Sequence, residues 1–122
     1  MGVQNAKELK AYQLSYGLAM DIFELSRSFP PEEKFALTSQ IRRSAPMNLR
    51  EAWAKRRYEA HFVSKLTDCD GESGETETSF DFAFDCGYIT EEQYRDLIKI
   101  NNEVGRLLGS MLNNPKQWAK TP

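Results

Sequence analysis

Apolar side chains recur every three or four positions in four stretches of the chain, which is the spacing of a helix with a buried face. The stretches cover residues 5–28, 31–55, 58–86 and 90–112. Pro30, Pro31 and Gly87 separate neighbouring stretches, and Thr90 is a typical N-cap residue. No segment alternates apolar and polar residues as a strand does. The pattern therefore predicts one all-α domain over residues 1–122, an antiparallel up-down-up-down four-helix bundle.

The last three predicted helices each carry one apolar stripe, which we expect to face the core. In residues 31–55 the stripe consists of Phe35, Thr38, Ile41 and Ala45. In residues 58–86 it consists of Phe62, Leu66, Cys69, Ser73, Thr76, Phe80 and Ala83. In residues 90–112 it consists of Tyr94, Leu97, Ile100, Val104, Leu108 and Met111.

The first predicted helix carries more apolar surface than one buried face needs. One face holds Leu9, Tyr12, Tyr16, Ala19, Met20 and Phe23, and the nearly opposite face holds Leu14, Leu18, Ile22 and Leu25. A broad core face is one interpretation, because soluble proteins expose many apolar atoms. The other is self-association through the second stripe, because contiguous apolar patches mark contacts between proteins. We prefer the second interpretation, with Leu14, Leu18, Ile22 and Leu25 as the candidate oligomer interface.

Charge is balanced overall and uneven locally. The 122 residues carry 16 Lys and Arg against 18 Asp and Glu, a net charge of −2, which argues against a dedicated nucleic-acid-binding domain. Residues 42–65 hold seven bases and two acids, whereas residues 67–85 hold seven acids and no base. Nucleic acid is a possible partner for the basic run through Arg50, Lys55, Arg56 and Arg57. We favour the alternative, in which these bases meet acids of a neighbouring helix or subunit.

Arg42 stands apart from the other bases, because its helical angle places it within the apolar stripe of residues 31–55. A buried guanidinium needs a carboxylate or carbonyl groups to offset its desolvation. The position predicts a structural ion pair. Of the candidates Glu51, Glu72 and Glu75, we expect Glu75 to be the partner.

The sequence offers few of the residues that catalysis or metal binding requires. One histidine, His61, and two cysteines, Cys69 and Cys86, provide neither four zinc ligands nor a di-iron set, and no nucleophile pairs with a base. We expect no catalytic residue, no metal, no cofactor and no enzyme activity, with both cysteines as small buried hydrophobic residues. Without an apolar leader or a membrane-spanning stretch, the expected location is the cytoplasm, with no membrane partner.

A stretch from Phe29 to Ser44, FPPEEKFALTSQIRRS, is similar to the FPxEExxxLTxQIRRS signature of the four-helix-bundle proteins encoded in intervening sequences of bacterial 23S ribosomal RNA genes. Further agreement comes from Glu51-Ala52-Trp53, Lys55-Arg56-Arg57-Tyr58, Cys86-Gly87-Tyr88-Ile89 and residues 105–111. The resemblance implies a left-handed antiparallel bundle, a homopentamer and no known catalytic activity. More distantly, the chain resembles accessory proteins of diversity-generating retroelements, which bind nucleic acid and a reverse transcriptase through a basic pentamer.

The chain departs from this family pattern after Ser44, where it is about three residues shorter and carries Pro46. We therefore expect the second helix to be irregular. Gly71 and Gly74 stand where the family has alanines, and each costs about 1 kcal/mol of helix propensity. The sequence as a whole predicts a non-catalytic, self-assembling scaffold or adaptor of unknown process. The alternative is an RNA- or DNA-associated pentameric accessory protein.

Overall fold

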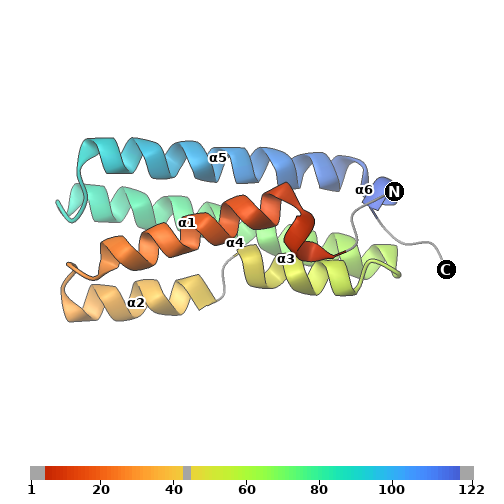
Figure 1. Cartoon of the computed structure of the whole chain (residues 1–122), viewed down its shortest axis with the longest axis horizontal. Coiled ribbons are helices and arrows are strands. Elements are labelled where there is room, and N and C mark those ends of the chain that lie inside the picture. The colour runs from red at the N-terminus through yellow and green to blue at the C-terminus, as the bar shows by residue number, and fades with distance from the viewer. Residues whose placement is uncertain (1–4, 43–44, 119–122) are drawn as a thin grey trace.

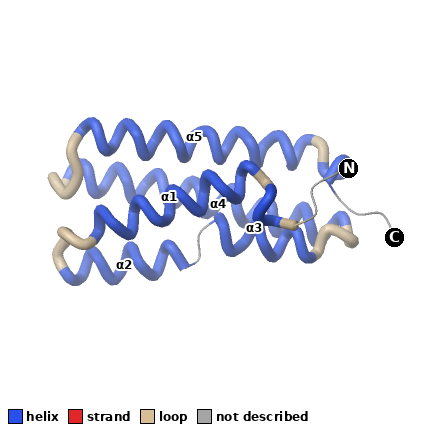
Figure 2. Tube along the Cα trace, in the orientation of Figure 1, coloured by secondary structure: helices blue, strands red, loops and turns tan. Residues whose placement is uncertain are grey.

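The computed structural model describes residues 5–42 and 45–118, and all regular structure within these ranges is helical (Figures 1 and 2). The prediction of an all-helical chain is confirmed. The elements are the 3-10 turn η1 (Ala6–Glu8) and the helices α1 (Lys10–Ser26), α2 (Pro31–Arg42), α3 (Ala45–Ala54), α4 (Glu59–Asp85), α5 (Glu91–Asn113) and α6 (Pro115–Trp118).

The second predicted helix consists of two helices, α2 and α3. The first ends at Arg42 and the second begins at Ala45, which places Pro46 in the first turn of α3. Proline lacks a backbone N–H, and its ring clashes with the carbonyl of the residue four positions earlier, so it fits the first turn but not a helix interior. Figure 1 shows α2 and α3 as separate segments on the same side of the molecule.

The longer helices lie side by side along the long axis of the molecule (Figure 1). Helix α4 packs along α3 on one side and along α5 on the other. Helix α1 packs on α5, on α3 and on α2. The result is a helical bundle in which α2 and α3 together occupy one side, and its interior lies between these elements.

The core predicted for α4 and α5 agrees closely with the structure. On α4 the buried residues are Phe62, Leu66, Cys69, Ser73, Phe80 and Ala83, and on α5 they are Leu97, Asn101, Val104, Leu108 and Met111. Thr76, Tyr94 and Ile100 are half-buried. Leu66 and Leu108 belong to one apolar cluster, and Phe80 and Leu97 belong to a second. Helix α4 continues through Gly71 and Gly74 without a break.

A buried polar pair, Ser73 and Asn101, links α4 to α5. The side-chain amide of Asn101 donates to the backbone carbonyl of Ser73 at 2.9 Å, and the Ser73 hydroxyl donates to Oδ1 of Asn101 at 3.2 Å. Buried polar atoms cost little free energy when they are bonded in this way. Sequence reasoning missed Asn101, although its position midway between Leu97 and Val104 follows from the helical period.

Our prediction of which face of α1 points away from the core was wrong. Leu18 and Ile22, which we predicted to form an oligomer interface with Leu14 and Leu25, are buried in the core. Leu14 and Leu25 are half-buried and pack against the core clusters. Ser15 and Ser26 are also buried on this side, and their hydroxyls donate to the backbone carbonyls of Tyr12 and Phe23 at 3.1 and 2.8 Å. Small side chains whose hydroxyls are bonded locally let α1 approach its neighbours, so the aliphatic face turns inward.

Two further expectations of burial fail. Phe35 of α2 is 79% exposed, because the helix turns Leu37 toward the bundle and Phe35 away from it. Cys86 is exposed at the C-terminal end of α4, whereas Cys69 is buried. The turn that follows needs Gly87, whose φ of 75° falls in the left-handed region. Thr90 and Gln93 then form a reciprocal capping box that begins α5.

In the described part of the chain, no helix is both long and apolar enough to cross a membrane.

Candidate interaction surfaces

One exposed apolar surface, the α1 stripe, consists of Tyr16, Met20 and Phe23. These residues follow one another at four- and three-residue spacing, and their exposed fractions are 52%, 50% and 39%. The ring of Tyr12 stacks on that of Tyr16 with 6.0 Å between centroids. The guanidinium carbon of Arg27 lies 5.5 Å from the centroid of Phe23. Aromatic side chains thus extend along the outer side of α1.

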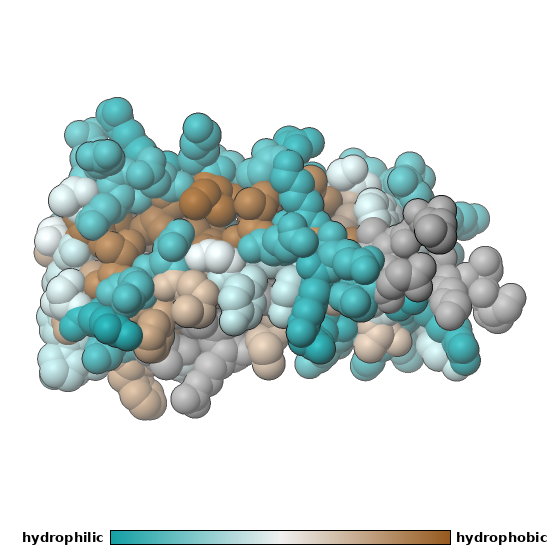
Figure 3. All heavy atoms as spheres, viewed as in Figure 1, coloured by the Kyte–Doolittle hydropathy of each residue, from teal (hydrophilic) through white to brown (hydrophobic). Residues whose placement is uncertain are grey.

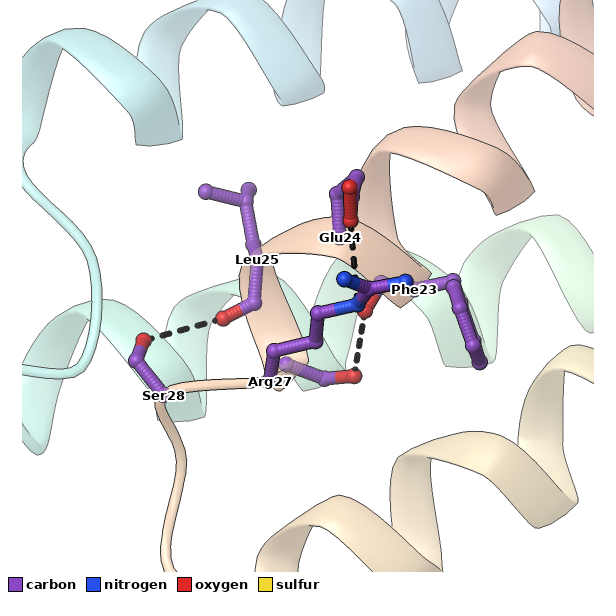
Figure 4. Close-up of polar contacts among 6 residues, drawn as sticks. Phe23, Glu24, Leu25, Arg27 and Ser28 are labelled. Carbon is purple, nitrogen blue, oxygen red and sulfur yellow. Dashed lines mark hydrogen bonds and ion pairs between the residues drawn. The ribbon is translucent and has the colours of Figure 1, made fainter.

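Figure 4 shows how the end of α1 orients its side chains. Leu25 points toward the neighbouring helix while Phe23 points away on another side. Arg27 is held beside Phe23 by an ion pair with Glu24, with Nε of Arg27 3.1 Å from Oε2 of Glu24. The guanidinium of Arg27 therefore lies over the face of the exposed Phe23 ring, in a cation–π contact.

The surface differs between helices in hydropathy (Figure 3). Apolar atoms are visible along the seam between α1 and α5 and over α1 and α2, while the outward side of α5 is hydrophilic. Leu14, Leu25, Ile100 and Leu107 are half-buried. On the face seen in Figure 3, the apolar surface is thus concentrated around α1 and α2.

The four bases predicted as a possible nucleic-acid patch lie at the end of α3 and in the turn that follows it. Arg50, Lys55 and Arg57 are exposed, and none of them forms an ion pair with another described residue. Arg56 is half-buried. Its guanidinium carbon lies 4.2 Å from the ring centroid of Trp53, and Nη1 donates to the Trp53 carbonyl at 3.0 Å. The structure therefore brings the four bases to one end but fixes Arg56 in a structural role.

The expectation that these four bases meet acids of a neighbouring helix is wrong for the described residues, and at this end the base that pairs with acids is Lys65. Nζ of Lys65 lies 2.9 Å from Oε2 of Glu51 and 3.8 Å from Oδ2 of Asp68. The hydrogen bond to Glu51 raises the pKa of Lys65, and the same bond lowers the pKa of Glu51. This pairing links the end of α3 to the start of α4.

A hollow opens beside these bases, between η1 and α3. It has a volume of about 330 Å³ and is lined by Asn5, Ala6, Lys7, Arg50, Trp53 and Ala54. Its two charged residues are both basic. The walls combine the apolar surfaces of Trp53 and two alanines with the side chains of Lys7 and Arg50, so the hollow suits a group that is apolar and carries negative charge.

A second hollow, of about 270 Å³, lies between α2 and α4. Phe29, Leu37, Phe82 and Tyr88 supply most of its apolar lining, and Glu33 supplies a carboxylate. Burial and the nearby Glu33 raise the pKa of Tyr88. The described residues of α2 pack mainly on α1 rather than on α4, which leaves this seam open.

The predicted Arg42–Glu75 ion pair stays a prediction. Arg42 is the last residue of α2, but its side chain lies outside the described residues. Glu75 is exposed on α4, whereas the alternative partner Glu72 is half-buried.

The residues capable of nucleophilic or metal chemistry are scattered. Burial raises the pKa of Cys69 to about 12, which keeps its thiol protonated at neutral pH. His61 is exposed, and its ring lies 5.8 Å from that of Tyr58. Among the described residues no three or more His, Cys, Asp or Glu side chains group as a metal site.

The chain matches a known protein family. The model of the 23S rRNA-intervening sequence protein family matches residues 7–110. The chain belongs to this family. The match extends from η1 to the last turns of α5, so both the α1 stripe and the basic end lie inside the family region. The resemblance seen in the sequence is thereby confirmed.

A protein of solved structure is similar to this chain in fold. It is a protein of unknown function from the S23 ribosomal protein family of Bacteroides thetaiotaomicron VPI-5482. The two chains are 28% identical with a TM-score of 0.74, and the alignment covers 85% of this chain and 96% of the other. No curated protein matches the chain. The solved structure supports the fold, and neither comparison names an activity.

Proposed function

We propose that this family member is a non-catalytic scaffold or adaptor that assembles with copies of itself. Its unit is an antiparallel up-down-up-down four-helix bundle, left-handed as in the family it resembles, and it acts in the cytoplasm without a cofactor. The observation that carries this proposal is the α1 stripe. Tyr16, Met20 and Phe23 remain exposed although the opposite face of the same helix already fills the core.

The physical support is the cost of leaving such residues in water. Burying an apolar side chain stabilises a complex by about 25 cal/mol for each Å² removed from water. Three large apolar side chains on one helix face therefore favour a contact that covers them, and exposed patches of this kind mark interaction sites. The family resemblance supports five copies as the assembly size.

Light scattering coupled to size-exclusion chromatography tests the proposal. The wild-type chain should have a mass several times 14.0 kDa at micromolar concentration. The variant Met20→Ser/Phe23→Ser should shift toward the monomer while it keeps its helical circular dichroism. Tyr58→Ser is the matched control, because Tyr58 is equally exposed but lies beyond α3, and it should assemble as the wild type does. A wild-type mass of one chain would overturn the proposal.

A second candidate, an RNA- or DNA-associated accessory protein, is favoured by the exposed Arg50, Lys55 and Arg57. If about four phosphates were neutralised, the logarithm of the affinity would fall with the logarithm of salt at a slope of about −3.6 for duplex DNA. We rank it second because acids lie next to the bases and Arg56 is bound to Trp53.

Fluorescence anisotropy with labelled duplex DNA and structured RNA separates the two candidates. We expect a dissociation constant weaker than about 10⁻⁵ M at physiological salt, within or above the non-specific range. Submicromolar binding that falls steeply with salt and is lost in Arg50→Gln/Arg57→Gln would place nucleic-acid binding first. The double variant Arg95→Gln/Lys99→Gln, which also removes two positive charges but from the exposed surface of α5, is the charge-matched control.

A further inference from the structure

Two features of the described surface are complementary in shape and charge. One is the exposed ring of Phe35 on α2, and the other is the hollow between η1 and α3. We propose that Phe35 of one copy inserts into this hollow on a second copy, with Glu32 beside Lys7 and Arg50. This inference rests on the proposed self-assembly and identifies a contact through which it occurs.

The hollow has room for a phenyl ring. Its volume is about 330 Å³, and an apolar cavity of about 150 Å³ in another protein already accommodates benzene. Trp53, Ala6 and Ala54 offer apolar contacts to such a ring. Trp53 is itself held from one side by Arg56, whose guanidinium lies over its ring. One wall of the hollow is therefore formed in advance by packed side chains.

Phe35 is the matching projection. It is 79% exposed, the most exposed of the large hydrophobic residues among those described. Because it is so exposed, the hollow of its own chain does not hold it. Glu32 is exposed and precedes Phe35 by one helical turn on the same face, whereas Glu33 lines the hollow between α2 and α4. The projection thus presents an aromatic ring next to negative charge.

Charge makes the match specific. Lys7 and Arg50 line the hollow, and no ion pair within the described residues occupies either of them. Glu32 supplies the opposite sign beside Phe35. A polyanion would satisfy the two bases but would leave the apolar walls unfilled. A second copy of this chain offers both a ring and a negative charge, because Phe35 and Glu32 come from one helical turn.

The contact is heterologous, because the projection and the hollow are different surfaces of the chain. Each copy then uses its projection on one neighbour and its hollow on another, which produces a closed ring or an open filament. A closed ring agrees with the assembly of several copies proposed above.

The first test replaces the ring. Phe35→Ser should lower the mass measured by light scattering at micromolar concentration, whereas Phe82→Ser should not, because Phe82 is an exposed phenylalanine on α4 that lines the other hollow, between α2 and α4, and not the hollow between η1 and α3. Trp53 gives a local signal when Trp118 is replaced by phenylalanine. Diluting the Trp118→Phe chain should shift the Trp53 emission as the ring leaves the hollow, and Phe35→Ser in the same background should abolish this shift.

The second test exchanges charges. Glu32→Arg and Arg50→Glu should each weaken assembly by about tenfold or more, because like charges then face each other. The chain that carries both changes restores the opposite-charge pair between copies and should assemble within about threefold of the wild type. Because each single variant changes an exposed residue, loss of folding does not explain the result.

The outcomes separate this contact from the proposed function. A monomeric wild type would overturn self-assembly and the contact together. A wild-type oligomer that is unchanged by Phe35→Ser and by both charge variants would overturn the contact alone and leave self-assembly standing. Weakening by each single charge variant without recovery in the double variant would also overturn it, because the pair would then not exist.

Discussion

Helices α5 and α1 are both amphipathic in sequence, yet only α5 has an unambiguous inner face. In α5 the apolar residues form one stripe with polar residues opposite, and the buried residues Leu97, Val104, Leu108 and Met111 are those the period predicts. In α1 apolar residues occupy two faces. The structure buries Leu18 and Ile22 with two serines and leaves Tyr16 and Met20 exposed.

The comparison shows that hydrophobicity identifies a core face only when the other face is polar. Where both faces are apolar, size decides which one fits against neighbouring helices. The inner face of α1 consists of aliphatic residues and serines, which allow close packing, and the bulkier aromatic residues are left outside. The same surplus of apolar side chains that made α1 ambiguous provides the surface that we propose for self-assembly.

The largest expected effect tests the faces of α1 directly. Ile22→Ala should destabilise the chain by about 3 kcal/mol by leaving a cavity in the core, whereas Met20→Ala should cost less than about 0.5 kcal/mol. Urea titrations at concentrations below the assembly range measure both, with Leu108→Ala as the α5 reference. Equal losses for Ile22→Ala and Met20→Ala would mean that α1 is rotated from the orientation described.

The next effect concerns the polar contact between α4 and α5. Asn101→Ala should destabilise the chain by about 2 kcal/mol, because it leaves the buried hydroxyl and carbonyl of Ser73 without this partner. The variant Ser73→Ala/Asn101→Leu, which replaces side chains on both helices with apolar groups, should lose less. If the double variant loses more stability than Asn101→Ala in the same denaturation assay, the hydrogen-bonded pair stabilises the fold more than an apolar pair of similar size does.

A smaller effect on stability is expected at the N-terminus of α5, which is capped differently from that of α1. Helix α5 begins with the side-chain cap of Thr90, while α1 begins at Leu9 with no such cap. Thr90→Ala should destabilise the chain by about 1 kcal/mol. Thr67→Ala is the control, because its hydroxyl donates within α4 to the carbonyl of Val63 and caps no helix end. Thermal unfolding of both variants should show a lower midpoint for Thr90→Ala alone.

The smallest expected effect concerns the exposed pair of Glu51 and Lys65 at the basic end. The pair lowers the pKa of Glu51 below 4.5, so its contribution to stability is present above that pH and is lost as the pH falls through the folded-state pKa. Glu51→Gln should therefore differ slightly from the wild type at pH 7 and converge with it in acid. Urea titrations at both pH values measure this difference, and a difference that grows in acid would contradict the assigned pairing.

The periodic pattern was sufficient for the positions of the helices and for the core faces of α4 and α5. The periodic pattern predicted one helix over residues 31–55, whereas the comparison with the family signature indicated an irregular helix around Pro46, and α2 and α3 are separate helices. It was not sufficient for Phe35, because α2 packs mainly on α1 and exposes a face that a fully packed helix would bury. The hollow beside Trp53 had no signal in the sequence at all, since its lining comes from residues more than forty positions apart.

The sequence by itself determined that the chain is helical, the approximate bounds of α1, α4 and α5, and to which family the chain belongs. These properties depend on local spacing, on prolines and glycines, and on motifs that neighbouring residues carry. Only the tertiary structure decided which face of α1 is inside, that Ser73 meets Asn101, and that Lys7 lies across a hollow from Arg50. Such properties depend on how residues distant in the chain pack against one another, and helical periodicity contains no information about that.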